Sequence, residues 1–443
     1  MGTEKEIDLS RLSIGLSSHE LCTRCGTCTG ACPTQAITVG ADRYPSLAPE
    51  KCIDCGACKS ACPGDEVRFS QLAAHTYGNG EAPDDFDGHV IARYVAHASD
   101  ENIRQGGAGG GVVTALLWDQ LKHNDVEGCI ATRMNPDRPW EGEYFIARSY
   151  EDMLLSQGSR YTIIPLNAVL AEIRSLVGPF AYAALPCQIH GYRNLEQFDG
   201  EIASKIHSVV GLFCGGALEP SLITDLVESK GIRLEELQDF QFRGGDWPGK
   251  MRAVLKNGEI RDLHYSNYKD GAYNYFTALY MPKRCQTCTD GSAYFSDVSV
   301  GDAWTRDRSG NYAYPRHSRL LVRTEKGHDI VKRAADRGTL VIKDVTSDPN
   351  YQTHRLHTKR KGVVAPIRVK RYEASGRAAP KYDLPVPTVT FRERLIERII
   401  TAILDLATIR LIRVTVLRLV TSKLAIPLIK YRQAVKKRKY RGR

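Results

Sequence analysis

The chain has 443 residues, enough for about two to four domains and a sizeable hydrophobic core. With 42% hydrophobic and 25% charged residues it has the composition of a folded globular protein, which excludes an intrinsically disordered chain. The net charge is +10, but it is unevenly distributed. Residues 391–443 contain 15 Lys/Arg and three Asp/Glu, which leaves 46 Lys/Arg and 48 Asp/Glu for residues 1–390. A near-neutral body with a basic tail argues against a core that binds nucleic acid.

Eight of the 13 cysteines form two runs near the N-terminus, each with the pattern C-x-x-C-G-x-C-x-x-x-C-P. The runs repeat with a period of 30 residues. This spacing is typical of bacterial ferredoxins with two [4Fe–4S] clusters, in which the fourth cysteine of each run binds the cluster of the other run. The predicted ligands are therefore Cys22, Cys25, Cys28 and Cys62 for one cluster, and Cys52, Cys55, Cys58 and Cys32 for the second.

Structural zinc is the alternative for these cysteines, because C-x-x-C pairs also bind tetrahedral zinc. A zinc site needs two C-x-x-C pairs. It does not explain why each run has a third and a fourth cysteine and why proline follows the fourth cysteine in both runs. The opening MGTEKEIDLSRLS is charged and lacks the apolar segment of a secretion signal. We therefore expect a cytoplasmic protein with reduced thiols, an N-terminal extension over 1–19 and a ferredoxin module over 20–72.

A glycine-rich loop precedes a segment whose apolar positions predict a helix over 112–122. Such a loop presents free N–H groups and the positive end of a helix dipole, which suits a phosphate or the edge of a flavin. It lacks the third glycine of a dinucleotide fingerprint and the Gly-Lys-Ser/Thr ending of a P-loop. A plain flexible turn is the alternative. The candidate cofactor-binding residues are Gly106, Gly107, Gly109, Gly110 and Gly111.

A second candidate cofactor-binding segment is QGSRY, which offers Gln157, Ser159, Arg160 and Tyr161. Its amide, hydroxyl, guanidinium and phenol groups suit a pyrimidine ring or a phosphate, with Arg160 as the best anion partner. An exposed polar loop is the alternative. Asp297 and Asp302, which flank the strand-like VSVG, either bind a ligand hydroxyl or cap turns.

Four of the remaining five cysteines stand in suggestive contexts, and we predict that they bind a third [4Fe–4S] cluster. They are Cys187, Cys214, Cys285 and Cys288. A reactive thiol beside a cofactor is the alternative for the first, and a packed strand end is the alternative for the second. The fifth, Cys129, is expected to be a buried small hydrophobe. His190 is a candidate catalytic proton donor, although a single histidine is more often structural.

Short apolar runs alternate with helical patterns over 73–345, which predicts an α/β domain with a mixed sheet. Asn257-Gly258 marks the turn of a hairpin within it. Proline, tyrosine and basic residues dominate 346–390, where we expect an extended connection. The predicted fold class is α+β: a small ferredoxin-like module, then the α/β domain, then a helical tail.

The tail, 391–443, is dense in Leu, Ile, Val and Arg, and its polar positions 394, 397, 398, 401, 405 and 408 have helical spacing. Charged residues interrupt every stretch long enough to span a bilayer, so a transmembrane helix is excluded. Pro427 is expected to bend or end the amphipathic helix. Apolar residues mixed with arginine, and then a polybasic end, favour a helix in an anionic membrane interface. A helix packed on the body is the alternative, and nucleic-acid binding is disfavoured.

Several separated motifs together resemble the coenzyme F-420 hydrogenase/dehydrogenase beta-subunit family. They are RQGGAGGGVVTALL, QGSRY, LPCQ, GLFCGG and RCQTCTDGSAYFSDVSVGDAW. The resemblance covers about 90–345, with the ferredoxin module in front, and stops before the tail. It implies an iron–sulfur flavoprotein that carries FAD, and it supports a third cluster near the four later cysteines.

From these features we expect an oxidoreductase that takes electrons from reduced ferredoxin or a similar donor. Clusters would pass the electrons to FAD and on to a small substrate, either the deazaflavin coenzyme or an envelope or polysaccharide-related precursor. The tail suggests a peripheral position on the inner face of the cell membrane or on a membrane complex. The alternative is a non-catalytic electron-transfer subunit of a larger redox complex.

Overall fold

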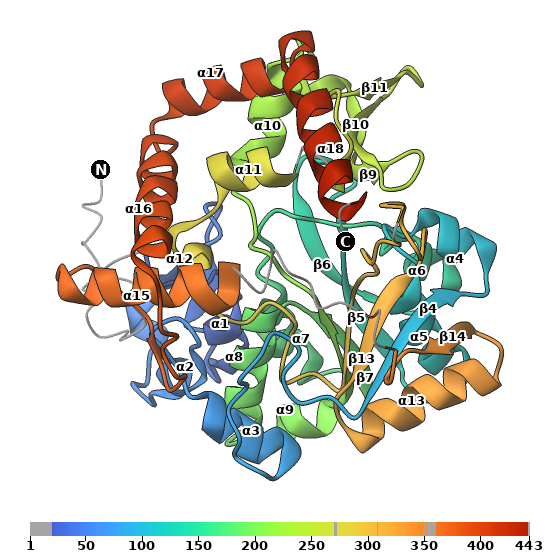
Figure 1. Ribbon diagram of the computed structural model, residues 1–443. Helices are drawn as coiled ribbons and strands as arrows, with labels where there is room; N and C mark the ends of the chain where they lie inside the picture. The colour runs from blue at the N-terminus through green and yellow to red at the C-terminus, as the bar shows by residue number, and fades with distance from the viewer. Residues whose placement is uncertain (1–19, 270–272, 308, 349–350, 352–359, 442–443) are drawn as a thin grey trace.

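The structure is a computed structural model that describes residues 20–269, 273–307, 309–348, 351 and 360–441 (Figure 1). The predicted N-terminal extension over 1–19 lies outside the described residues. An eight-stranded sheet with the order β14-β4-β13-β12-β8-β7-β5-β6 forms the centre. Its strands are β4 (Ala92–Ala98), β5 (Gly128–Met134), β6 (Gly142–Ala147), β7 (Phe180–Ala184), β8 (Ile206–Leu212), β12 (Val298–Asp302), β13 (Ser318–Val322) and β14 (Leu340–Asp344).

The sheet is mixed, as predicted. Its four neighbouring strands β12, β8, β7 and β5 run parallel, and the pairings on either side of them are antiparallel. Side chains that alternate along a strand enter different cores: Phe180 and Tyr182 pack on one face of β7, and Ala181 and Ala183 on the other. Because both faces are buried, this strand is apolar throughout rather than alternating.

Helices cover both faces of the sheet, which gives three layers. One face packs against α3 (Phe69–Tyr77), α7 (Val169–Ile173), α8 (Pro186–Glu196) and α9 (Gly200–Lys205). The other face packs against α5 (Val112–Lys122) and α13 (Glu325–Asp336). The helix predicted over 112–122 is confirmed with the same bounds. Two short helices, α4 (Glu101–Gly106) and α6 (Tyr150–Leu155), flank this layer.

The ferredoxin module repeats one small unit twice. Each unit has a five-residue helix, α1 (Thr27–Ala31) or α2 (Ala57–Ala61), and α1 is followed by a hairpin of β1 (Ile37–Val39) and β2 (Pro45–Leu47). Gly26 and Gly56 cap the two helices with φ of 85° and 74°, a conformation that glycine adopts without steric cost. Gly26 also lies against the body, since a Cβ there would be 2.6 Å from the Pro165 carbonyl oxygen.

A second, three-stranded sheet extends the body on one side. It contains β9 (Leu237–Gly244), β10 (Lys250–Leu255) and β11 (Ile260–Asp262), in the order β11-β10-β9. The hairpin predicted at Asn257-Gly258 joins the last two strands, and Gly258 has φ of 84°. This sheet packs against α10 (Ser221–Glu228) and α11 (Tyr273–Tyr280).

The prediction of an extended connection over 346–390 is wrong in its middle. A π-helical turn, η6 (Arg360–Val364), leads into α15 (Ala365–Ala374), and Pro366 stands in the first turn, where a missing N–H costs nothing. The chain then crosses to the ferredoxin module, where β15 (Lys381–Tyr382) pairs with β3 (Glu66–Val67).

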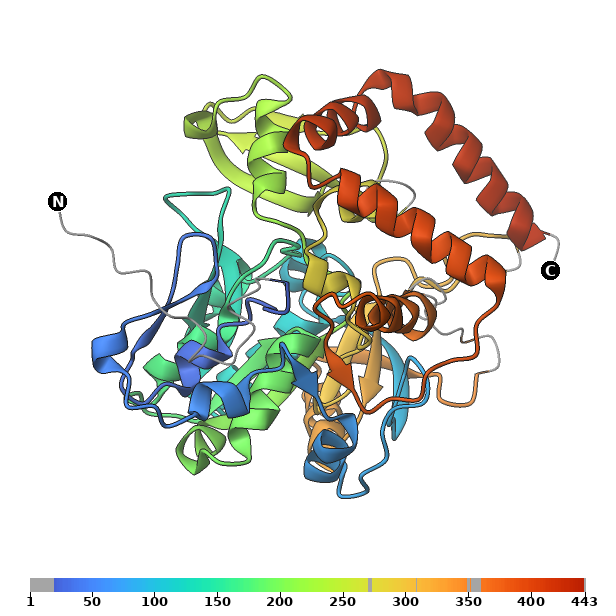
Figure 2. The ribbon, with the colours of Figure 1, turned by 90° about the vertical axis from the view of Figure 1, so that its left-hand side faces the viewer.

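The tail is helical, as its sequence pattern predicts. It forms α16 (Phe391–Leu406), α17 (Arg410–Val420) and α18 (Ile426–Arg441), and Pro427 lies in the first turn of α18 rather than at a helix end. Figures 1 and 2 show these three helices as an open frame along one side of the body. Among the helices that the structure describes, none combines the length and apolarity needed to span a bilayer.

Candidate active site

Three residues that could bind a ligand or a metal lie at or just after the carboxyl ends of the parallel strands, at one edge of the central sheet. Cys187 lies just after β7 and Cys214 just after β8, while Asp302 is the last residue of β12. Because these strands are parallel, their carboxyl ends meet at the same edge, which is where open α/β sheets bind ligands. The candidate site is built at this edge.

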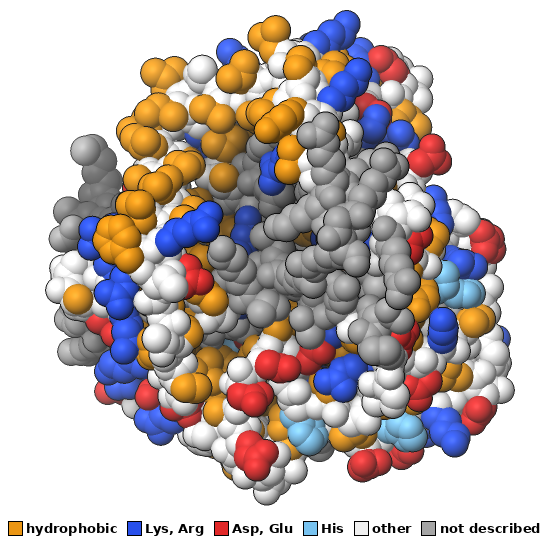
Figure 3. All heavy atoms as spheres, in the orientation of Figure 1, with side chains coloured by type: hydrophobic (Ala, Val, Ile, Leu, Met, Phe, Trp, Pro, Cys, Tyr) orange, Lys and Arg blue, Asp and Glu red, His pale blue; other side chains and the backbone are white. Residues whose placement is uncertain are grey.

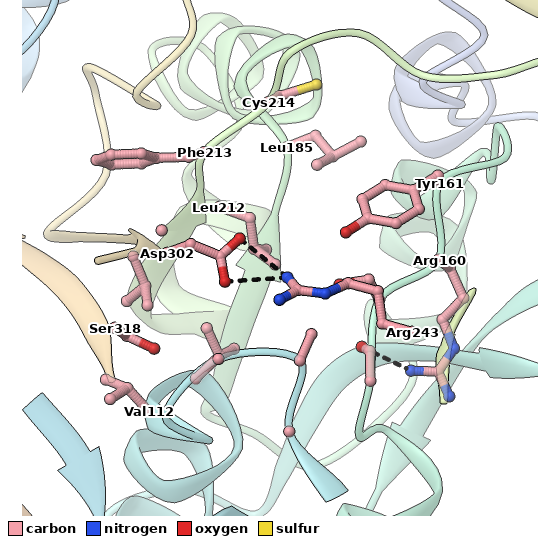
Figure 4. A pocket seen from close by; sticks show the side chains of 18 of the residues that line it. Val112, Arg160, Tyr161, Leu185, Leu212, Phe213, Cys214, Arg243, Asp302 and Ser318 are labelled. Carbon is pink, nitrogen blue, oxygen red and sulfur yellow. Dashed lines mark hydrogen bonds and ion pairs between the residues drawn. The ribbon is translucent and has the colours of Figure 1, made fainter. Parts of the chain in front are cut away.

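A cavity of about 610 Å³ opens there (Figure 4). It brings together two predicted segments that are about 50 residues apart in the chain, the glycine-rich loop and QGSRY. The predicted residues that line it are Gly107, Gly109, Gly111, Ser159, Arg160 and Tyr161. The other three do not line it: Gly106 ends α4, a Cβ on Gly106 would overlap the Gln157 side chain, and Gly110 packs against β4 and β13.

The glycine-rich loop is held tightly against the sheet. The Gly110 N–H donates to Ser318 Oγ at 3.0 Å, and its carbonyl accepts from the Ala98 N–H at 2.7 Å. A Cβ on Gly110 would lie 2.6 Å from the Ala96 carbonyl oxygen. Gly111 caps α5 with φ of 72°. The loop therefore needs glycine for close approach, and the interpretation as a plain flexible turn does not describe it.

Arg160 does not extend into the cavity as a free cation. Its Nη1 donates to the carbonyls of Ser156 at 2.7 Å and Gln157 at 2.6 Å, and its Nη2 donates to the carbonyl of Leu155 at 2.6 Å. Burial lowers the pKa of this guanidinium to about 10. The side chain thus closes the carboxyl end of α6 and shapes the loop, while the cavity takes its charge from another arginine (Figure 4).

Arg243 is that arginine, and no sequence pattern identified it. It extends from β9, and its Nη1 donates to both carboxylate oxygens of Asp302 at 2.9 Å (Figure 4). Burial lowers its pKa, but the charges of Asp302, Tyr161 and Tyr268 outweigh burial and raise it overall. Nη2 is buried and has no hydrogen-bond partner among the described residues, so a donor is left for a ligand. Only the fold brings β9 and β12 together, so no local sequence signal marks this pair.

Aromatic side chains form one wall of the cavity. The Tyr161 ring stacks on Tyr268 with centroids 5.2 Å apart and an angle of 8°. Tyr268 in turn faces Trp304, which stacks on Trp247 at 5.3 Å. The Lys269 ammonium lies 4.5 Å from the Trp304 ring centroid. Flat faces with a cation beside them suit a planar, electron-rich ligand.

The eight ferredoxin cysteines gather in two groups that cross between the runs. The pKa of the Cys62 thiol is raised to about 12, by burial first and also by the charges of Cys25 and Cys22 of the other run. The pKa of Cys58 is raised by burial first, and then by Cys32 of the first run and by its own neighbours. Cys62 lines a small cavity with Cys22, Cys25 and Cys28, and Cys32 packs in one cluster with Cys58, so the fourth cysteine of each run lies beside the other run.

The two groups differ in depth. Cys22, Cys25 and Cys28 are buried, whereas Cys52 and Cys55 are exposed. Buried polar contacts attach the inner group to the body: the Asn167 N–H donates to the Cys25 carbonyl at 2.9 Å. The outer group faces solvent and the inner group faces the α/β domain.

The four later cysteines converge next to the inner group. A small cavity of about 40 Å³ is lined by Cys187, Cys214, Cys285 and Cys288, and also by Cys25 of the ferredoxin module. Burial raises the pKa of Cys187 well above its ordinary value, and the other thiols add to the rise. Among the described residues, no three Cys, His, Asp or Glu side chains lie close enough to hold one metal ion. The four thiols therefore meet at one small cavity that also borders the ferredoxin module.

Two further residues of this small cavity were missed from the sequence. Gln188 lies in the first turn of the helix α8, where its Oε1 accepts from the Leu185 N–H at 2.8 Å. Lys361, from the segment expected to be an extended connection, is 4% exposed and lines the cavity. Burial lowers the pKa of Lys361, but the thiolates of the nearby cysteines outweigh burial and raise it.

His190 lies with the thiols and does not line the large cavity. Its Nε2 is 2.9 Å from Asp290 Oδ2, and both side chains are buried. The same carboxylate accepts from three backbone N–H groups, of Ser292, Ala293 and Tyr294. This placement separates His190 from the large cavity and gives it a structural partner. Asp297 also has a structural role, since it accepts from the Val209 N–H at 2.8 Å.

The two cavities share a wall. Cys214 and Leu185 line both of them, and so does Gln188. Cys28 packs with Cys32, Cys58 and Cys62, and Cys25 lines a cavity with the four later cysteines, of which Cys214 also borders the large cavity. This arrangement depends on the docking of the ferredoxin module, where Arg24 forms a bidentate pair with Glu219 at 2.6 and 2.9 Å.

Known proteins resemble this chain in sequence and in fold. It is 27% identical over 327 residues to the coenzyme F420-dependent sulfite reductase of Methanocaldococcus jannaschii, a match that covers 70% of this chain and 45% of that protein. The chain thus spans about half the length of that relative. It is 24% identical over 352 residues to a subunit of the F(420)H(2) dehydrogenase of Methanosarcina mazei, a match that covers 78% of this chain and 90% of that one.

A solved structure has a similar fold. A chain of the F420-reducing [NiFe] hydrogenase complex of Methanosarcina barkeri matches with a TM-score of 0.54 and 21% identity. The match covers 69% of this chain and 99% of that chain.

Family models account for most of the chain before the tail. Residues 16–73 match a 4Fe-4S dicluster domain. Residues 93–171 and 178–348 match the N-terminal and C-terminal parts of the coenzyme F420 hydrogenase/dehydrogenase beta subunit, and together these two cover more than half of the chain. The chain therefore belongs to the coenzyme F420 hydrogenase/dehydrogenase beta-subunit family and carries a 4Fe-4S dicluster domain in front.

Proposed function

We propose that this chain is an iron–sulfur flavoprotein oxidoreductase. It takes electrons from reduced ferredoxin or a similar donor and delivers them to a small substrate beside a flavin. The observation that carries the proposal is the shared wall: Cys214 and Leu185 border both the small thiol-lined cavity and the large cavity. Electron transfer from the clusters to a flavin needs the two cavities to be adjacent. A module that only carried clusters would not need a large cavity beside them.

The donor sets fit three [4Fe–4S] clusters. The crossed groups in the ferredoxin module offer four thiols each, and backbone N–H groups point at their sulfurs, as from Gly64 to Cys62 at 3.3 Å and from Ala36 to Cys32 at 3.2 Å. The third set is Cys187, Cys214, Cys285 and Cys288. When bound, the clusters would supply one-electron transfer.

The large cavity fits a flavin nucleotide such as FAD. The glycine loop offers a close backbone approach at Gly107 and Gly109, and α5 begins at its end. Nη2 of Arg243, which lacks a partner within the described residues, offers a buried cationic donor, and Tyr161 offers an aromatic face. A bound flavin would supply the conversion between one-electron and two-electron chemistry.

The favoured substrate is the deazaflavin coenzyme, because relatives are named as F420-dependent enzymes. The aromatic wall of Tyr268 and Trp304, with Trp247 stacked on Trp304, offers faces for a second planar ring. The chain's own groups bind and orient both rings and exclude water from the space between them. A precursor of envelope polysaccharide is the second candidate, favoured only by the basic tail.

Anaerobic purification of the full chain followed by cofactor extraction tests the proposal. We expect about 12 iron atoms per chain and one extractable flavin. Reduced ferredoxin should then bleach the flavin, and the deazaflavin absorbance should fall when that coenzyme is added. Iron and sulfide without flavin would instead favour the non-catalytic electron-transfer subunit. Zinc without iron would contradict both functions.

A further inference from the structure

The tail carries most of the large hydrophobic side chains that are exposed in the described part of the protein. Of the 24 large hydrophobic side chains that are exposed within the described residues, 15 lie between Phe391 and Val435. Figure 3 shows them gathered along α16 and α17, at the upper left of the molecule. We call the outward side of α16, α17 and α18 the tail face. An exposed apolar patch of this kind marks an interaction site.

The amphipathic helix α16 is mounted with its apolar side outward. Its polar residues Glu397 and Thr401 are 0% and 4% exposed. Glu397 accepts from Arg368 Nε at 2.9 Å and from Arg371 Nε at 2.9 Å, and both arginines belong to α15. A helix that stabilised only its own protein would bury its apolar side instead. The outward residues are Leu395, Ile399, Ile403 and Leu406.

Polar contacts also hold α17 and the residues after it against the body, with apolar side chains directed outward. Arg410 Nη2 donates to Asp225 Oδ1 at 3.0 Å, and Thr421 accepts from Lys230 Nζ at 2.9 Å. Leu417 is buried between these contacts. Leu411 and Leu424, in contrast, are 78% and 77% exposed. The apolar side of the frame is therefore directed away from the body by ion pairs and hydrogen bonds.

The charge around the tail face is strongly positive. Exposed basic side chains border the apolar residues, at Arg392, Arg394, Arg398, Arg418, Lys423 and Lys430. The last eight residues, 436–443, add six Lys/Arg in sequence. The tail has three acidic residues, of which Glu397 is buried in its ion pair. An apolar stripe bordered by cations is complementary to a surface that is apolar below and anionic above.

We propose that the tail face docks on a bilayer that contains anionic lipids, with α16 and α17 lying in the interface. The inverted mounting of α16 explains why a membrane is its partner: the polar side is already occupied by α15, and the apolar side is free to enter the acyl region. Arg432 of α18 lines the large cavity, so the tail that carries the docking face also borders that cavity. This inference goes beyond the proposed redox chemistry.

Vesicle flotation of the full chain tests the proposal. The vesicles contain either phosphatidylcholine alone or phosphatidylcholine with phosphatidylglycerol. The test variant is Leu411→Glu with Leu424→Glu. The control is Val177→Glu with Phe198→Glu, because these two residues are also exposed, at 76% and 49%, but lie outside the tail. Both variants lose two apolar side chains and gain two negative charges.

We expect the wild type and the control to float with the anionic vesicles and to be released by high salt. The tail variant should lose about a hundredfold in partition coefficient. Equal flotation of the tail variant and the wild type would overturn the proposal, as would wild type that stays unbound. A wild-type dimer that the tail variant converts to monomer, without flotation, would assign the face to a second copy. Iron and flavin content, measured on each preparation, reports the redox function separately.

Discussion

Cys129 and Cys288 show how differently two cysteines of one chain are placed. Cys129 is fully buried in β5, and its thiol donates to the Leu117 carbonyl at 3.4 Å. Cys288 borders the small cavity together with three other thiols of the proposed third cluster. The expectation that Cys129 packs as a small hydrophobe agrees with its environment. The two residues therefore form a matched pair for mutation.

We expect Cys288→Ser to lower the iron content by about four atoms per chain, because the third [4Fe–4S] cluster loses a ligand. The clusters of the ferredoxin module, whose thiols come from other segments, should remain. Cys129→Ser is the control and should keep the full iron content. Iron analysis and electron paramagnetic resonance of the reduced protein measure both variants. An unchanged iron content in the Cys288 variant would contradict the assignment.

Lys361 provides a second prediction at the residue scale. Its ammonium is buried beside the thiols of Cys214, Cys285 and Cys288. A positive charge there stabilises the reduced, more negative state of a bound cluster. Lys361→Met should therefore lower the reduction potential of the proposed third cluster. Lys361→Arg keeps the positive charge and should have a potential close to that of the wild type. A redox titration followed by electron paramagnetic resonance measures the potential, and equal potentials in all three proteins would refute the role.

At the scale of elements, a methyl group added to the glycine-rich loop would meet different neighbours at Gly109 and at Gly110. A Cβ on Gly109 would lie 3.1 Å from Ser318 Oγ and 3.2 Å from Asp302 Oδ1, both side-chain atoms at the wall of the large cavity. A Cβ on Gly110 would instead meet backbone, at 2.6 Å from the Ala96 carbonyl oxygen. The first position is therefore suited to testing the cavity without breaking the fold.

We expect Gly109→Ala to lower flavin content several-fold while the thermal stability changes little. The control is Gly200→Ala, since a Cβ on Gly200, in α9, meets nothing within 4 Å. Extracted flavin per chain and the melting temperature are the two measurements. Full flavin content in the Gly109 variant would argue against flavin contact by this loop, and flavin loss in the control would make the effect non-specific.

His264, which follows β11, makes the three-stranded sheet sensitive to acid. Burial lowers its pKa from 6.5 to about 4, and its Nε2 accepts from the Met251 N–H at 3.0 Å. Between these two pKa values the unfolded chain binds the proton more strongly, so acidification favours unfolding. From pH 7.5 to 5 the loss is about 2 kcal/mol. His264→Gln should flatten this pH dependence of stability in denaturant titrations, and an equally steep dependence would contradict it.

At the scale of the whole molecule, the ferredoxin module and the body are joined by the Arg24–Glu219 pair. Arg24 is 5% exposed and also lies over the Tyr44 ring at 4.7 Å. Arg24→Met leaves the Glu219 carboxylate without its partner, which we expect to weaken docking by about 2 kcal/mol. Amide hydrogen exchange in residues 20–72 should then accelerate while the central sheet keeps its protection. Unchanged exchange would show that the other contacts suffice.

The spacing of residues predicted those features that depend on neighbours in the chain. The two cysteine runs, the helix α5 and the turn at Asn257-Gly258 were identified because each is a short, continuous pattern. The crossed grouping of thiols follows a known ferredoxin pattern and needs no further fold information. The structure of α15 was missed because its stabilising partner, Glu397, is about 30 residues away.

The sequence by itself determined the family, the ferredoxin module, the mixed sheet and the basic, amphipathic character of the tail. These features depend on local spacing, periodicity and composition. Only the tertiary structure decided that Cys214 borders two cavities, that Arg243 rather than Arg160 supplies the buried charge, and that α16 turns its apolar side outward. Each of these depends on contacts between segments far apart in the chain, which no local pattern encodes.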